Sequence, residues 1–272
     1  MPIDMRIWRV DENRLRPVTP EKLPLEQTLE DWLAADIAMV SDDLLVIGRQ
    51  LSSPLGGTLD LLAVDPNGDL AVLELKRDKT PRDVVGQTLH YAAWIRTLTW
   101  EQICAIAADY FGGVPLADRF QQRFGQPLPD DLNTSHRMCI VATDLDPRSE
   151  TIVNYLFEVH GVNINVVFFR HYRDADGDAF VARSWLIDPY QVQERAAVAN
   201  ARRRPPLTLQ ELRDLAVTNG VAGTYDAVYD FFRGSANSMR RTPNNIAFVL
   251  ATSGGQTAAF SVYPGRSSTE SG

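Results

Sequence analysis

An α/β fold followed by a small α+β domain is what this sequence predicts, and three observations support it. In the first 190 residues, a helical pattern is followed by three consecutive strand patterns and then by a mixture of helices and strands, an order typical of a sheet covered by helices. A polar stretch over 191–206, ending in "RRRPP", then interrupts the periodic pattern. Two helical and two strand patterns come after it, and 272 residues are enough for two cores.

The chain is therefore expected to have four segments. A pair of short strand patterns, "RIWRV" and "RLRPV", predicts a hairpin at the start, and a cluster of prolines separates it from the next segment. The segments are an N-terminal hairpin over 1–20, an α/β domain over 21–190, a linker over 191–206 and a small α+β domain over 207–272.

The α/β domain is expected to begin with an amphipathic helix and a β-meander. Leu25, Leu29 and Leu33 recur at helical spacing, which predicts the helix. The "PNGD" sequence at 66–69 is a strong hairpin signal between two apolar runs. Strands are expected at 43–51, 58–65 and 70–77.

The later elements are predicted from the same two periodicities. A helix is expected over 81–98, with Thr80 as its N-cap and Pro81 in its first turn. The Gly- and Pro-containing stretch 112–134 is expected to be a loop. Further helices are expected at 101–111, 149–161, 208–219 and 223–233, and strands at 136–143, 163–172, 179–187, 245–251 and 257–263.

The composition argues against a membrane-spanning or secreted protein. No apolar run has the roughly 18–20 residues needed to cross a membrane, and "MPIDMRIWRVDENR" lacks the apolar core of a secretion signal. Cys104 and Cys139 lie far apart in apolar surroundings, which indicates small core residues in a reducing compartment. We therefore expect a cytoplasmic protein without a membrane partner.

The net charge of −8 argues against a surface that is basic throughout. The charge is uneven, however. Residues 191–272 hold nine Arg, no Lys and six Asp or Glu, a sum of +3, so the first 190 residues carry −11. A local basic channel is compatible with this distribution, and so is an acidic enzyme with a cation site.

Three ionisable residues interrupt the apolar strands of "GGTLDLLAVDPNGDLAVLELKRDKTPRDVVGQTLHY", which spans 56–91. Glu74 and Lys76 are two apart in one strand, so both point to the same face. The hairpin brings Asp60 beside Glu74 on that face. A buried salt bridge or a solvated edge strand would explain a lone Glu-x-Lys.

The next helix adds Gln87 and Tyr91, one turn apart on one stripe, to the same wall. The whole set suits phosphodiester hydrolysis. Asp60 and Glu74, with the backbone carbonyl of Leu75, offer hard oxygen ligands to Mg²⁺ or Mn²⁺. Such an ion would withdraw charge from a phosphate oxygen and lower the pKa of a water. Lys76 would orient or deprotonate that water and offset phosphate charge.

The segments "LDLLAVD", "AVLELKR" and "GQTLHY" resemble the PD-(D/E)xK nuclease superfamily, in its branch with a Gln-x-x-x-Tyr motif. Over about 25–98 the chain is similar to the NucS/EndoMS group of DNA endonucleases and their uncharacterised bacterial relatives. Leu59 stands where the superfamily's proline would be. The resemblance implies a restriction-endonuclease-like αβββαβ core with a central mixed sheet.

The same resemblance implies roles for individual residues. Asp60 and Glu74 match metal ligands, Lys76 matches the catalytic lysine, and Gln87 and Tyr91 match the helix motif. An acidic residue of the first helix often joins such sites, and Glu30, with Glu26 as the second choice, is the expected one. The mismatch endonucleases carry a DNA-binding domain ahead of the nuclease domain, whereas only about 24 residues precede it here, so the chemistry transfers better than mismatch specificity.

The expected function is a Mg²⁺- or Mn²⁺-dependent DNA endonuclease acting in DNA repair or defence. A non-catalytic nucleic-acid or protein-binding module on the same fold is an alternative, as is a nuclease that acts on RNA or modified DNA. A homodimer would suit double-strand cleavage. Basic residues that could contact nucleic acid are Arg77, Lys79, Arg82, Arg240 and Arg241, the last two alternatively in an exposed turn.

Overall fold

The chain folds into two compact units, and each is described by itself. The larger unit contains almost all of the first 196 residues, and the smaller one is formed mainly by Ala197–Gly272. The computed structural model describes residues 5–12, 14–23, 26–76, 83–192, 208–236, 238–241, 246–252 and 255–264. The expected N-cap Thr80, the adjoining Pro81 and most of the expected linker 191–206 lie outside these residues.

Within the described residues, the larger unit is built on an eight-stranded mixed sheet. Its strand order is β1-β2-β7-β6-β5-β4-β3, with β8 also paired to β7. The meander β3–β4–β5 is antiparallel, whereas β5, β6 and β7 run parallel. The strands are β1 (Ile7–Asp11), β2 (Arg14–Glu21), β3 (Leu45–Ser52), β4 (Thr58–Val64), β5 (Leu70–Lys76), β6 (His136–Ala142), β7 (Ile164–Arg173) and β8 (Ala179–Trp185). The expected α/β class with a central mixed sheet is confirmed.

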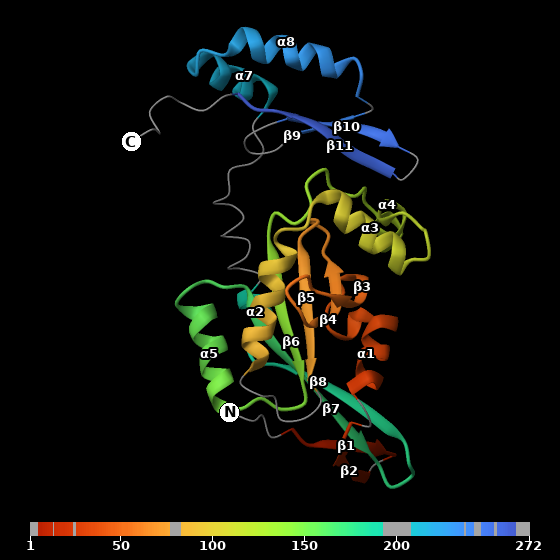
Figure 1. Cartoon of the computed structure of the whole chain (residues 1–272). Helices are drawn as coiled ribbons and strands as arrows, with labels where there is room; N and C mark the ends of the chain where they lie inside the picture. Colours follow the sequence, from red (N-terminus) through yellow and green to blue (C-terminus); the bar gives the residue numbers. More distant parts are fainter. Residues whose placement is uncertain are drawn as a thin grey trace. The chain divides into compact units, whose positions relative to one another are not determined.

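Helices cover both faces of this sheet (Figure 1). One face packs against α2 (Asp83–Ile95) and α5 (Pro147–Glu158), together with α3 (Trp100–Tyr110) and α4 (Leu116–Phe124). The other face packs against α1 (Glu26–Ala35) and the short 3-10 helix η1 (Ile37–Met39). Alternate residues of β5 enter the two cores, so the strand is buried on both sides, as expected for a central strand.

The β4–β5 hairpin is fixed by its turn. Gly68 adopts φ 81°, which side chains disfavour, and its N–H donates to the Asp65 carbonyl. Asp65 accepts the backbone N–H groups of Asn67 and Asp69 through Oδ1, at 2.8 and 3.1 Å. The Asp69 carboxylate in turn accepts the Ser135 N–H at 2.5 Å, just before β6. This end of the sheet is therefore rigid, and Asp60 and Glu74 lie toward the opposite ends of their strands.

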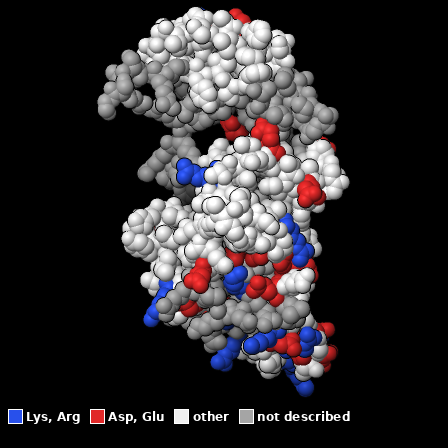
Figure 2. Space-filling model, in the orientation of Figure 1, with Lys and Arg blue, Asp and Glu red and all other residues white. Residues whose placement is uncertain are grey.

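Charged side chains of both signs are mixed over the β1–β2 and β7–β8 hairpins (Figure 2). Arg9 of β1 donates through Nη1 to Asp174 and Asp178 of the β7–β8 turn, at 2.7 and 2.8 Å. Burial opposes the charge of Asp174, yet the Arg9 hydrogen bond dominates and lowers the pKa of that carboxyl. These ion pairs tie the N-terminal hairpin to the distal end of β7.

Two parts of the predicted secondary structure are wrong. The expected loop 112–134 contains helix α4, whose inward face has the buried Leu116 and Phe120 and the partly buried Phe124, each one turn after the last. The helix has only nine residues, and the glycines and prolines on either side of it favoured a loop. Arg240 and Arg241 lie in a strand, β9 (Ser238–Arg241), rather than in an exposed turn. β9 has four residues and exists because it pairs with the neighbouring strand β10.

The smaller unit has two helices over a three-stranded antiparallel sheet in its described part. Thr208 begins the first helix through a capping box in which Glu211 takes part. The core contains Leu212, Tyr225 and Phe248. The elements are α7 (Leu209–Thr218), α8 (Ala222–Arg233), β9, β10 (Ile246–Thr252) and β11 (Gly255–Val262).

Two expectations drawn from the composition, on membrane-spanning segments and on the two cysteines, can be compared with the structure. Among the described residues, there is no helix with both the length and the apolar character needed to cross a membrane. Cys139 is buried and Cys104 is partly buried, and neither is in a disulfide. Burial raises the pKa of the Cys139 thiol to about 12, which is the behaviour of an inert core cysteine.

Candidate active site

The structure brings Asp60, Glu74 and Lys76 together on the sheet face that α2 covers. Leu61 of β4 is paired with Leu73 of β5, so the next residues along the two strands are Asp60 and Glu74. Lys76 Nζ donates to Glu74 Oε1 at 2.8 Å. The side chain of Glu74 is only 2% exposed and that of Lys76 is 22% exposed. The three charges are therefore grouped in a largely water-excluded place.

Asp60 is held by two donors. The Leu75 N–H donates to Asp60 Oδ2 at 2.8 Å, and Gln50 Nε2 donates to Oδ1 at 3.1 Å. A carboxylate has about four acceptor positions, so both oxygens keep capacity for a further ligand. Leu75, whose carbonyl is the expected ligand, thus orients Asp60 through its amide.

Glu74 Oε2 is the anomaly of this site. It is buried, and it has no hydrogen-bond partner among the described residues. A buried acceptor without a partner costs about 1–3 kcal/mol, and more when it is charged. A cation bound between Glu74 and Asp60 would satisfy this oxygen.

The donor set fits a hard divalent cation. The described part of the chain contains no cluster of three or more His, Cys, Asp or Glu side chains able to hold a metal. Mg²⁺ is usually bound through one or two carboxylates, with waters and substrate phosphates completing the shell. Two carboxylates, Asp60 and Glu74, therefore match the needs of Mg²⁺ or Mn²⁺ and not those of a closed structural zinc site.

Burial perturbs all three groups. It raises the pKa of Glu74 to about 7, and the charge of Asp60 adds to this, while the hydrogen bond from Lys76 opposes it. Burial also raises the pKa of Asp60, against the Leu75 amide and the Lys76 charge. For Lys76, burial alone would lower the pKa, but the hydrogen bond to Glu74 and the surrounding carboxylates raise it overall. The positive charge of a bound cation would offset the effect of burial and lower both carboxyl pKa values.

Two glutamates of α1 approach the site in different ways. Glu30 is buried, and it accepts Arg49 Nε at 2.6 Å and Gln50 Nε2 at 3.0 Å. Its charge raises the pKa of Asp60. Glu26, one turn earlier, raises the pKa values of both Glu74 and Lys76 through its charge. Glu30 is thus linked to Asp60 through an amide, while Glu26 acts on Glu74 and Lys76.

Gln50 is the residue that sequence reasoning missed. Its amide nitrogen donates to Glu30 and Asp60, and so joins two carboxylates from different elements. Its backbone has φ 50°, a conformation that non-glycine residues adopt at a cost and that often marks functional sites. The available signal was the polar pair Arg49-Gln50 in the second half of the strand "LVIGRQLS", whose first half is apolar.

The helix α2 contributes Tyr91, which is buried. Burial and the charge of Glu74 raise the pKa of its hydroxyl, which the backbone of Thr58 also hydrogen-bonds. A Cβ on Gly57, at φ 85°, would lie 2.6 Å from the Tyr91 Oη. The glycine therefore lets the loop before β4 approach the tyrosine.

The structure says less about the remaining predicted site residues. Gln87 is exposed, one turn before Tyr91 on α2. His90 Nε2 lies 3.3 Å from the Ser53 Oγ and supports the same loop that Gly57 belongs to. Arg77, Lys79 and Arg82 lie outside the described residues, and for Arg240 and Arg241 only the backbone of β9 is described.

Comparisons with known proteins give two similar solved structures. No protein-family model and no curated protein sequence matches the chain. The first structure is a repair endonuclease from Pyrococcus abyssi, at 16% identity and a TM-score of 0.31, over 58% of this chain and 63% of that one. The second is EndoMS in complex with double-stranded DNA, at 15% identity and a TM-score of 0.33, over 60% of this chain and 64% of that one. The chain thus spans just under two thirds of each.

Both similar structures are of the kind that the sequence resemblance names, the NucS/EndoMS endonucleases. At such low TM-scores they carry no argument about activity. The chemistry of this chain has to be argued from the arrangement of Asp60, Glu74 and Lys76.

Proposed function

We propose that the protein is a Mg²⁺- or Mn²⁺-dependent endonuclease that hydrolyses phosphodiester bonds of DNA. The observation that carries the proposal is the buried, unpartnered Oε2 of Glu74 beside Asp60 and Lys76. A salt bridge alone explains Oε1 of Glu74 but leaves Oε2 without a function. A site for a hard cation next to an ammonium explains both oxygens.

Each residue has a distinct role in this proposal. Asp60 and Glu74 hold the ion, which when bound supplies Lewis-acid activation of phosphate and water. Lys76 places a positive charge next to Glu74, where it offsets charge that develops on the phosphate and orients the attacking water. Tyr91 and the exposed Gln87 lie along α2, where they can position the nucleic-acid backbone.

DNA is the proposed substrate because the sequence resemblance covers the Asp60, Glu74-x-Lys76 and Gln87-x-x-x-Tyr91 pattern of DNA endonucleases. A role in repair or defence and assembly as a homodimer are part of the same proposal. Base identity is read by groups that contact base edges, whereas the roles proposed above for the site residues are to hold the ion, the water and the phosphate backbone. We therefore expect cleavage governed by DNA structure and not by a base sequence.

The test is a cleavage panel with Mg²⁺, Mn²⁺ or excess EDTA, on single-stranded, duplex, mismatched, flapped and modified DNA and on RNA. Asp60→Asn, Glu74→Gln and Lys76→Gln should each reduce the cleavage rate by roughly 10²-fold or more. Lys22→Gln and Glu158→Gln remove matched charges from exposed positions and should leave it unchanged.

Four results would contradict the proposal. Full activity of Glu74→Gln with Mg²⁺ would show that Glu74 does not hold a required metal ion. Cleavage undiminished by EDTA would show that the reaction does not depend on a metal ion. Binding of DNA without cleavage of any substrate, together with no heat of Mg²⁺ or Mn²⁺ binding in calorimetry, would favour a non-catalytic binding module. Cleavage of RNA alone would transfer the chemistry to another substrate.

A further inference from the structure

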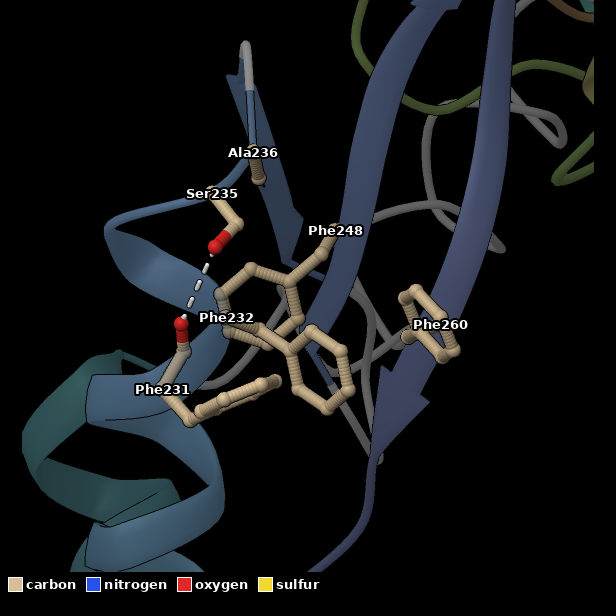
Figure 3. A pocket seen from close by; sticks show the side chains of 6 residues that line it. All are labelled: Phe231, Phe232, Ser235, Ala236, Phe248 and Phe260. Atoms are coloured by element: carbon tan, nitrogen blue, oxygen red, sulfur yellow. Dashed lines mark hydrogen bonds between the residues drawn. The ribbon is translucent and has the colours of Figure 1, made fainter.

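The smaller unit contains an aromatic cavity of about 240 Å³ that the active site does not use. Figure 3 shows phenylalanine rings from α8 and from two strands converging around it. The lining residues are Phe231, Phe232, Ser235, Ala236, Phe248 and Phe260. Its wall is therefore aromatic and almost wholly apolar.

Two of these rings are exposed, which is the unusual feature. Phe231 is 70% exposed and Phe260 is 48% exposed, whereas Phe248 is buried in the core. Phe260 stacks on Phe232 with ring centroids 4.2 Å apart, and Phe231 meets Phe232 edge-on at 5.0 Å. The partly buried Phe232 thus holds two outward-facing rings in place. Rigid, exposed aromatic faces beside a cavity suit a flat aromatic ligand, because they can stack on it without reordering.

Charged residues of both signs, Arg233 with Asp226 and Asp230, lie on the helix that carries Phe231, and the segment as a whole is basic. Residues 191–272 carry +3, from nine Arg and six Asp or Glu, on a chain whose other part carries −11. The guanidinium of Arg233, on the same helix as Phe231, lies 6.0 Å from the ring centre of Tyr229. Arginine pairs with phosphate and stacks on planar groups. Aromatic faces together with arginines are the combination by which proteins hold single-stranded nucleic acid.

We propose that the aromatic cavity binds an unpaired base of single-stranded DNA, with Phe231 and Phe260 as stacking platforms. The Ser235 hydroxyl, which donates to the Phe231 carbonyl at 3.5 Å (Figure 3), lies at the rim and keeps acceptor capacity toward a base edge. The choice of DNA rests on the proposed nuclease function, whereas the stacking chemistry rests on the cavity alone. The unit would favour substrates with unpaired segments.

The test measures binding of the full-length protein to a fluorescein-labelled oligo(dT) of about 20 nucleotides by anisotropy, in excess EDTA so that it is not cut. Phe231→Ala and Phe260→Ala should each raise the Kd, roughly 5- to 150-fold per lost stacking partner. Phe231→Leu should fail as Phe231→Ala does, because it keeps an apolar side chain without the ring. Phe231→Tyr should bind like the parent protein.

Two controls separate stacking from other effects. Tyr190→Ala removes another exposed aromatic side chain, from the larger unit, and should not change the Kd. An abasic oligonucleotide of the same length keeps the phosphates but lacks the bases. It should bind the parent and Phe231→Ala equally weakly, and the salt dependence of oligo(dT) binding should be the same in both proteins, because phosphate contacts are untouched.

The proposal is overturned if Phe231→Ala and Phe231→Leu bind oligo(dT) as tightly as the parent. It is also overturned if Phe231→Ala changes only the oligomeric state in light scattering, which would make the cavity a contact between copies. Its failure and that of the nuclease proposal are distinguishable. If the parent cuts DNA but Phe231→Ala binds oligo(dT) as tightly as the parent, only the proposal about the cavity is wrong. If binding depends on the Phe231 ring but the protein cuts no substrate, only the nuclease proposal is wrong.

Discussion

Replacing Glu74 by Gln should change how the stability of the metal-free protein depends on pH. Glu74 has a pKa of about 7 in the folded protein, raised from 4.5 chiefly by burial. Between these values the unfolded chain has released the proton and the folded chain still holds it. The folded state binds more protons there, so its stability falls as pH rises through this window and levels off above it.

The size of the effect is set by the two pKa values. Each tenfold change in proton affinity corresponds to about 1.4 kcal/mol, so the rise from 4.5 to about 7 corresponds to about 3 kcal/mol. Glu74→Gln cannot ionise and loses this dependence. The stability difference between variant and parent should therefore grow by about 3 kcal/mol from about pH 4 to about pH 8.

Urea unfolding followed by tryptophan fluorescence measures this difference. Four of the five tryptophans belong to the larger unit, so the signal reports mainly that unit. The measurement is made in excess EDTA and then repeated with Mg²⁺ at a hundred times its Kd, which should stabilise the parent by about 2.7 kcal/mol at about pH 8. Glu74→Gln should gain far less. Parallel pH profiles for the two proteins in EDTA would refute the argument that ionised Glu74 is buried at a cost.

Two further changes test how the surroundings of the site are held. Gly57→Ala should destabilise the protein by more than Gly56→Ala and should also slow cleavage. Both glycines have positive φ, but only at Gly57 would a Cβ lie against the Tyr91 hydroxyl. Equal losses of stability in urea unfolding would contradict this. Gln50→Ala should weaken Mg²⁺ binding roughly 10- to 100-fold in calorimetry, because it removes a donor that orients Asp60; an unchanged Kd would show that the Leu75 amide suffices.

The predicted strands and most predicted helices are found because their apolar periodicity is strong and local. The β-meander depends on one turn, and the hairpin signal at 66–69 fixes the register that places Asp60 opposite Glu74. Strand alternation then determines that Lys76 shares their face. These relations are contained in adjacent residues, and a sequence is enough to find them.

What the sequence could not show depends on residues that are distant in the chain. The bridge from Gln50 to Glu30 spans two elements and needs a left-handed backbone at Gln50, which no local pattern predicts. The helix α4 has only nine residues, too few to be stable alone in water, so it is stabilised by burying its inward apolar side chains against the rest of the fold. Strand β9 likewise forms only because β10 offers it a pairing partner.

Glu74 shows both what the local sequence predicts and what only the fold reveals. The sequence places a glutamate in a strand whose other residues are apolar, and only the fold shows that one oxygen is satisfied by Lys76 while the other has no partner among the described residues. A protein that needed only a salt bridge would be as stable, or more so, with apolar residues in both places. The pair lies beside Asp60, Gln50 and a glycine that admits Tyr91, and the proposed binding site for a cation and a phosphate would account for the structural cost of each.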